Sequence, residues 1–187
     1  MKRVLLTVVL LLTSPVFAQA GTRQPAKQWG SVGAATRFGN SGLTLGYGQQ
    51  DLLSPGTDAR FGATYFNSDP YNLNGAFSAE LSADALAYTY DPGPQRGLAL
   101  VAYGGLGPRF LVQTTFVYYA QGDSYLTAYQ LNVGGVGGLE ARLGDFGVFL
   151  ELDVSLPALG LIGPYFRVFP TEAFPLPKLT LGANYFF

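Results

Sequence analysis

The sequence predicts an all-β protein, an antiparallel up-and-down transmembrane β-barrel of eight to ten strands. Three observations carry this prediction. Apolar and polar residues alternate repeatedly from Trp29 to the C-terminus, which is the period of a β-strand. Glycine is frequent, and only 12% of the residues are charged, where a soluble domain has about 25%. The chain also lacks cysteine and histidine, so disulfides do not hold it together.

The first residues resemble no strand and are typical of a secretory signal peptide. Lys2 and Arg3 precede an apolar run over 4–12, and small residues follow at Ala18 and Ala20. The run is shorter than the roughly 18 apolar residues of a spanning helix, so we expect cleavage after Ala18 or Ala20. The predicted divisions are a signal peptide (1–18), a flexible N-terminal extension (19–28) and one β-barrel domain (29–187).

Each later strand is predicted from its alternation. One face is apolar, while the other carries small or polar residues, with Phe149 and Phe186 as exceptions. The residues of the apolar faces are Leu43, Leu45 and Tyr47; Phe61, Ala63 and Tyr65; Phe110, Val112, Thr114, Phe116 and Tyr118; Phe146, Val148, Leu150, Leu152 and Val154; and Leu179, Leu181, Ala183, Tyr185 and Phe187.

Turn-forming residues separate these strands. The predicted turns lie at 39–42, 54–56, 68–70, 91–94, 104–108, 121–124, 144–145, 157–160 and 170–177. They give ten strands if 73–90 is one strand. Merging or splitting 73–90 or 125–142 changes the number to eight or twelve, and an even number is expected of a single-chain bacterial barrel.

Most strand charges share a face with glycines. They are Arg37, Arg60, Glu80, Asp84, Arg109, Glu140, Arg142, Glu151, Asp153, Arg167 and Lys178. Cations and anions nearly balance among them, as a sealed interior requires. Glycine covers nothing on a surface in water, but in a narrow barrel it leaves room for long side chains from the opposite wall. We therefore expect these residues to form a lumen charge network, with the apolar face toward lipid. A soluble lipocalin-like barrel, with the reverse orientation, is the alternative.

Aromatic residues near the strand ends are placed like the girdles of a membrane barrel. Phe110 and Tyr118 lie eight residues apart on one apolar face, which corresponds to about 20 Å of membrane after tilting, somewhat under the roughly 25 Å apolar band. Trp29, the single tryptophan, begins the first strand. There we expect it to anchor the barrel at the membrane interface.

The last strand carries a family resemblance. Leu179, Leu181, Ala183, Tyr185 and the terminal Phe187 resemble the C-terminal signal strand of bacterial outer-membrane proteins. Together with the signal peptide, this strand resembles the class of small barrels that includes the transmembrane domain of outer-membrane protein A, outer-membrane protein X and the outer-membrane protein W type. The resemblance implies a location in the bacterial outer membrane, contact with its lipid, and recognition of these five residues by the barrel-assembly machinery.

Four charges on two successive strands form the first candidate site, namely Glu140, Arg142, Glu151 and Asp153. They are read as a structural salt-bridge plug or as an ion-selective lining, and the narrow lumen favours the plug. Glu151 and Asp153 could serve acid–base chemistry. Pairing with Arg142, Arg167 and Lys178 is the preferred interpretation, because buried charges need partners.

Two other patterns carry weaker signals. Asp51, Asp58 and Asp69 suit calcium in chemistry, but they lie in separate turns without the spacing of a calcium loop. The glycines of 134–138 lack the Lys-Ser/Thr pair of a phosphate loop, and they predict a kinked strand without side chains. We expect neither a metal nor a cofactor.

These features favour a non-enzymatic barrel in the outer membrane, either structural or a narrow pore for a small solute. The absence of histidine removes the usual catalytic pairs, although an Asp or Glu hydrolase stays open. Without Lys2 and Arg3 the formal charge falls from 11 minus 12 to 9 minus 12, or −3, so the chain offers no basic field for nucleic acid. The alternative is a barrel that binds a hydrophobic ligand, either like outer-membrane protein W or as a soluble periplasmic or secreted carrier. Its inner face would include Leu111, Val117, Tyr119 and Phe149.

Overall fold

A computed structural model describes residues 28–38, 40–67, 77–90, 98–117, 124–162, 165–168 and 175–187. These residues form the strands β1 (Gln28–Arg37), β2 (Asn40–Ser54), β3 (Thr57–Asn67), β4 (Phe77–Tyr90), β5 (Leu98–Val117), β6 (Ser124–Leu143), β7 (Phe146–Ile162), β8 (Tyr165–Val168) and β9 (Leu176–Phe186). Within the described ranges, no helix is long and apolar enough to cross a membrane. The predicted signal peptide lies outside the described residues, as does all of the predicted extension except Gln28, which begins β1.

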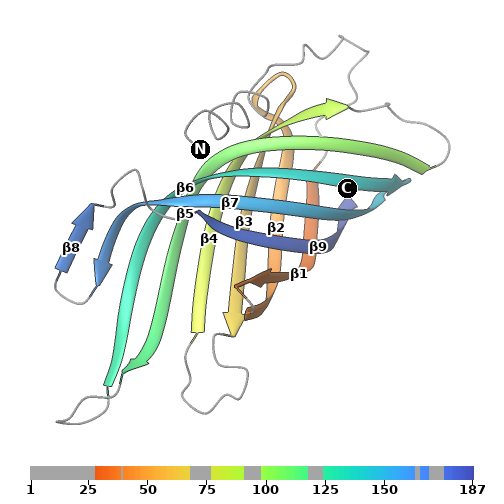
Figure 1. Cartoon of the computed structure of the whole chain (residues 1–187). Helices are drawn as coiled ribbons and strands as arrows, with labels where there is room; N and C mark the ends of the chain where they lie inside the picture. Colours follow the sequence, from red (N-terminus) through yellow and green to blue (C-terminus); the bar gives the residue numbers. More distant parts are fainter. Residues whose placement is uncertain are drawn as a thin grey trace.

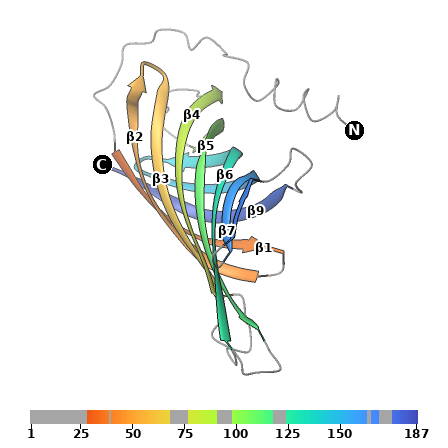
Figure 2. The same ribbon diagram turned by 90° about the vertical axis from the view of Figure 1, so that its left-hand side faces the viewer.

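The strands close into a ring (Figure 1). Each of β1 to β7 pairs antiparallel with the next, and β9 pairs with both β7 and β1. The short β8 pairs with β7 along residues 159–162, beyond the segment of β7 that β9 covers. The ring therefore contains eight strands, which confirms an antiparallel up-and-down barrel within the predicted range. Figure 2 shows the hairpin of β5 and β6, the longest strands, projecting past its neighbours.

The count of ten strands is wrong because two predicted turns are strand interior. Residues 104–108 lie within β5, and residues 157–160 lie within β7. In β5 the glycines allow close approach of the neighbouring backbone, since a Cβ on Gly107 would collide with the carbonyl oxygen of Ala83 in β4. In β7 the chain passes Pro157 with a bulge and keeps its pairing to β6. Glycine and proline break alternation here without turning the chain.

The stagger of the ring explains its narrow interior. From Val32 the register leads through β2 to β6 to Leu159 of β7, and through β9 it leads to Val148 of β7. These two residues are eleven positions apart, and Ala158 between them is the unpaired residue of the bulge, so the effective stagger is ten. Such a stagger implies strands tilted by about 40° and a lumen that side chains can fill.

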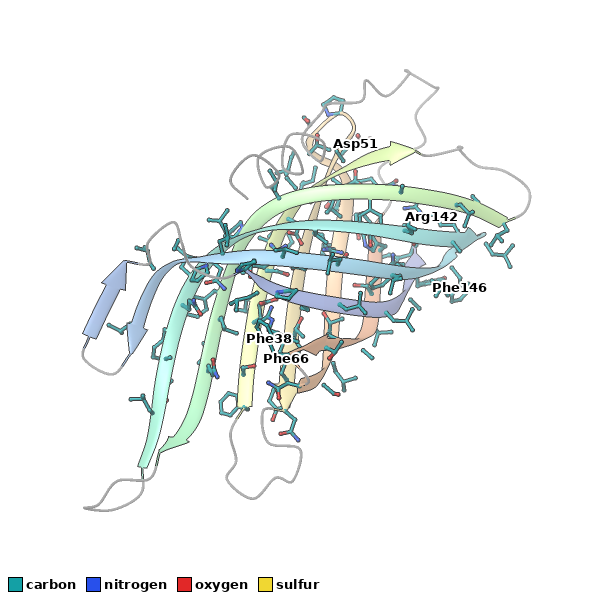
Figure 3. All side chains as sticks on the ribbon, in the orientation of Figure 1. Phe38, Asp51, Phe66, Arg142 and Phe146 are labelled. Atoms are coloured by element: carbon teal, nitrogen blue, oxygen red, sulfur yellow. The ribbon has the colours of Figure 1, made fainter. Side chains whose placement is uncertain are left out.

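The two faces of the wall differ as the alternation predicts (Figure 3). Leu45 of β2 and Leu181 of β9 are 63% and 57% exposed on the outside, whereas Arg109 and Asn132 are fully buried inside. A lipocalin-like soluble barrel would require the reverse orientation. The outer surface is thus the one that suits lipid.

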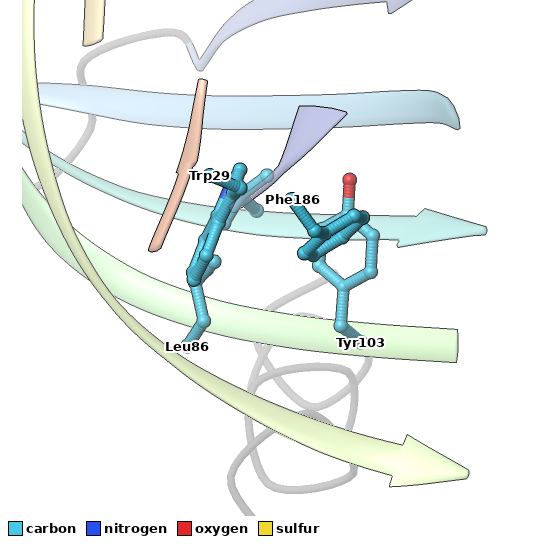
Figure 4. Close-up of a cluster of buried hydrophobic side chains, with 5 residues drawn as sticks. Trp29, Leu86, Tyr103 and Phe186 are labelled. Carbon is cyan, nitrogen blue, oxygen red and sulfur yellow. The ribbon is translucent and has the colours of Figure 1, made fainter. Parts of the chain in front are cut away.

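The prediction for Trp29 is wrong. Its side chain is only 3% exposed and lies inside the barrel with Leu86, Tyr103, Val136 and Phe186 (Figure 4). The centroids of the Trp29 and Phe186 rings are 6.0 Å apart. Trp29 faces Gly48 of β2, and a Cβ on that glycine would collide with the indole. The missing side chain at Gly48 therefore makes room for the indole inside the barrel.

Candidate functional site

The charged interior of the barrel contains most of the predicted lumen network. Eight of its members are buried: Arg37, Glu80, Asp84, Arg109, Glu140, Glu151, Asp153 and Lys178. Arg60 and Arg142 are half-buried. Arg167 belongs to β8, and its side chain lies outside the described part of the structure. The buried members come from β1, β4, β5, β6, β7 and β9, so only ring closure brings them together.

One half of the network centres on Lys178 of β9. Its ammonium lies 2.6 Å from Oε1 of Glu80 and 3.3 Å from Oδ2 of Asp153. Glu80 also pairs with Arg37, whose guanidinium carbon lies 5.0 Å from the centre of the Phe66 ring. Each carboxylate in this half therefore has a cationic partner, and Lys178 links β4 to β7 across the interior.

The other half centres on Arg109 of β5. Its Nε lies 2.8 Å from Oδ2 of Asp153, and its Nη2 lies 2.6 Å from Oδ1 of Asp84. Asp84 also pairs with Arg60, whose Nη2 lies 2.9 Å from Oδ2 of Asp84. Arg60 reaches on to Glu151, which accepts a 3.0 Å hydrogen bond from the hydroxyl of Tyr103. The two halves share Asp153 and form one continuous chain of four cations and four anions.

The four-residue cluster predicted from β6 and β7 is divided in the structure. Glu140 pairs with Arg142 at 2.8 Å and accepts a 2.8 Å hydrogen bond from the amide of Asn184. Arg142 also lies over the Phe186 ring. Glu151 and Asp153 belong instead to the longer chain. Of the partners predicted for them, Lys178 does pair with Asp153, whereas Glu151 pairs with Arg60.

Several interior residues were missed by sequence reasoning, although the alternation contained their signal. Tyr103, Asn132 and Ser155 are buried. Each shares strand parity with a recognised inner residue; for example, Asn132 has the parity of Glu140 in β6. These uncharged polar residues were not predicted as part of the lumen network, yet they complete the inner surface.

A small cavity lies beside these groups. Its volume is about 20 Å³, and it is lined by Ser31, Thr44, Ser82 and Thr180 together with Arg60, Glu151 and Lys178. That volume has room for roughly one water molecule. Burying charges away from water costs free energy, and this cost is offset where opposite charges and hydrogen bonds surround each charged group.

Two of the three aspartates considered for calcium, Asp51 and Asp58, lie on either side of the turn that joins β2 to β3. The backbone N–H of Asp51 donates a 2.9 Å hydrogen bond to Asp58, while Asp51 accepts one from the N–H of Gly56 at 2.5 Å, so these aspartates hold a turn. Asp69 lies outside the described residues. Across the described ranges, no cluster of three or more ligand-type side chains could hold a metal. The glycines of 134–138 lie within β6.

The residues predicted for hydrophobic-ligand binding and those predicted for assembly lie on opposite faces of the barrel wall where the structure describes them. Leu111 and Phe149 are buried inside, whereas the side chain of Val117 and all of Tyr119 lie outside the described part. Leu179, Leu181, Tyr185 and Phe187 are exposed on the outside, and Ala183 between them is half-exposed. Phe146 of β7 contacts Tyr185 with ring centroids 5.0 Å apart.

Comparison with known proteins gives a match in fold. No protein-family model matches the chain, and no curated protein matches it. Neisserial surface protein A is 11% identical, with a TM-score of 0.55 over 87% of this chain and 96% of that chain. The N-terminal β-barrel domain of Pseudomonas aeruginosa OprF is 15% identical, with a TM-score of 0.53 over 86% and 97%. A major outer membrane protein from Thermus thermophilus is 20% identical, with a TM-score of 0.55 over 88% and 100%. The chain has the fold of small bacterial outer-membrane barrels.

Proposed function

We propose that this protein is a non-enzymatic integral barrel of the bacterial outer membrane, with a closed lumen and a structural role. The signal peptide predicted at residues 1–18 would direct export. The outer face of β9 from Leu179 to Tyr185, together with the terminal Phe187, would be recognised by the barrel-assembly machinery. The direct partner of the folded protein is membrane lipid, because its outer surface carries leucine, valine and aromatic side chains.

The proposal of a closed lumen is supported by one observation, the chain of ion pairs inside the barrel. The chain of ion pairs from Arg37 to Glu151 crosses the interior, and the Trp29 cluster fills the end where Gln28 and Phe187 meet. Opening a path for ions would require separating buried charges, which costs several kcal/mol per ion. A narrow pore is therefore the less favoured version of the function.

A hydrophobic-ligand barrel has less support. Leu111 and Phe149 do lie inside, but a ligand pocket needs about 300 Å³ or more. The cavity beside Phe149 offers about 20 Å³. No observation favours this alternative over the closed barrel.

Conductance of the refolded protein tests the proposal. In planar bilayers we expect no stepwise current above that of bare lipid at any voltage, because the charges are paired and the lumen is filled. Insertion is verified by a gel on which unboiled protein migrates faster than boiled protein, and a reconstituted porin serves as the positive control. Reproducible channel steps from protein that passes this gel test would replace the closed barrel by the narrow pore.

A further inference from the structure

The inner wall where β6 meets β7 carries a group of polar atoms without partners. Asn132 and Ser155 are fully buried, and Asp153 is almost so. Within the described structure, neither Nδ2 nor Oδ1 of Asn132 forms a hydrogen bond, nor do Oγ of Ser155 and Oδ1 of Asp153. Leaving such groups unsatisfied is costly in a protein interior.

Ser155 and Asp153 lie beside the space over Gly134, and Asn132 is the next residue on the same face of β6. Ser155 is the cross-strand partner of Gly134. A Cβ on Gly134 would lie 3.0 Å from Cβ of Ser155 and 3.4 Å from Oδ1 of Asp153. The absent side chain thus leaves a cradle with donors and acceptors on its sides.

The strand pairing is also irregular beside this cradle. Asn132 faces Pro157, and the register of β6 against β7 shifts at this point. Proline has no N–H to give to the ladder. A bridging group at this point would add a link between the two strands.

The chemistry of the cradle selects its occupant. Asp153 gives Oδ2 to both Arg109 and Lys178, while its Oδ1 faces the space over Gly134. The occupant must donate to Oδ1 of Asp153 and to Oδ1 of Asn132, and must accept from Nδ2 of Asn132. A metal cation cannot accept from Nδ2 and would meet two cationic side chains. An anion would meet the carboxylate of Asp153.

We propose that water is bound over Gly134 and bridges β6 to β7 through Asn132, Ser155 and Asp153. Water is small, neutral, and both donates and accepts, and buried waters typically make about three hydrogen bonds of this kind. This site is independent of whether the lumen conducts. It makes bound water part of the barrel wall at the place where a bulge and a proline make the β6–β7 ladder irregular.

A high-resolution crystal structure of the full chain in detergent, with a second crystal soaked in rubidium, tests the occupant. We expect density over Gly134 within hydrogen-bond distance of Asn132, Ser155 and Asp153, without anomalous signal after the soak. An anomalous peak would assign the site to a cation instead. An empty cradle, or a direct bond between Asn132 and Ser155, would overturn the proposal.

Stability measurements in the same detergent test the bridging role. Gly134→Ala is expected to expel the water and to lower the urea midpoint, and to speed amide exchange around Asn132 by about tenfold, as expected for one buried polar group left unpaired. Gly135→Ala is the matched control, because its Cβ would meet the side chain of Leu106 at a similar 3.3 Å on the outer face. In an Asn132→Leu, Ser155→Ala background the effect of Gly134→Ala should largely vanish. An undiminished effect there would indicate steric strain alone and contradict the bridge.

Discussion

Arg109 occupies the most enclosed position of the ion-pair chain. Its side chain is fully buried and contacts two carboxylates, those of Asp84 and Asp153. Removing it leaves Asp153 with Lys178 and Asp84 with Arg60, each short of one partner. Removing a buried cation lowers the free energy of unfolding by more than the ion pair contributes to it. The reason is that the carboxylates left behind stay buried away from water without their full set of partners.

We therefore predict that Arg109→Met lowers the free energy of unfolding by about 3 to 5 kcal/mol, measured by urea denaturation in lipid vesicles. The control is Arg142→Met, since the side chain of Arg142 is 15% exposed and that of Arg109 is 0% exposed. It should cost clearly less. Equal losses for the two variants would show that burial of the ion-pair chain does not set its energetic weight.

At the scale of the element, β1 shows how alternate residues of one strand face the outside and the inside of the barrel. Val32 is exposed on the outside, whereas Trp29, Ala35 and Arg37 are buried. Trp29 has the parity of these inner residues, so regular alternation takes it inward. Its neighbours Gly48 and Phe186 provide the space and the contact inside.

The fluorescence of the single tryptophan checks this orientation. We predict that lipids with brominated chains quench Trp29 weakly, because the barrel wall separates the indole from the acyl chains. A Trp29→Phe, Leu45→Trp variant moves the tryptophan to the outer face of β2 and should be quenched several times more strongly. Strong quenching of the unsubstituted protein would restore the interface-anchor interpretation.

At the scale of the whole molecule, the barrel turns an apolar surface outward, and such a surface suits lipid. Leucines and aromatic residues face outward on β2, β3, β6, β7 and β9, and the polar groups are turned inward. The energy of an outward charge should consequently depend on its depth in the membrane. The depth of a residue in the membrane is set by how the whole ring is positioned in the lipid, and a single strand does not determine it.

A pair of substitutions on β2 measures this dependence. Leu45→Arg, in the middle of the strand, is expected to destabilise the protein by about 2 to 4 kcal/mol, whereas Leu52→Arg, near the turn that follows β2, should cost about 0 to 1 kcal/mol. Both leucines are exposed on the surface, so burial within the protein does not separate them. Equal costs in vesicle-based unfolding would contradict a membrane position centred on the middle of β2.

The positions of the strands and their outward and inward faces could be predicted from the sequence, whereas the number of strands could not. Leu43 to Tyr47 and Leu179 to Tyr185 alternate cleanly, so their outer faces could be predicted. Gly104 to Pro108 and Pro157 to Gly160 have the composition of turns, yet they lie within β5 and β7. Glycine at a close approach and glycine at a turn look alike in sequence, because the neighbouring backbone that distinguishes them comes from another strand.

The sequence by itself determined the β class and the two-faced strands, because side-chain alternation is a local property of an extended chain. It also determined that the charged face contains both signs in near balance. The tertiary structure decided which charge meets which, as when Arg60 of β3 pairs with Glu151 of β7 across the interior. It likewise decided that the ring has eight strands. These features depend on register and stagger around a closed ring, which are set by the pairing of distant segments and not by local pattern.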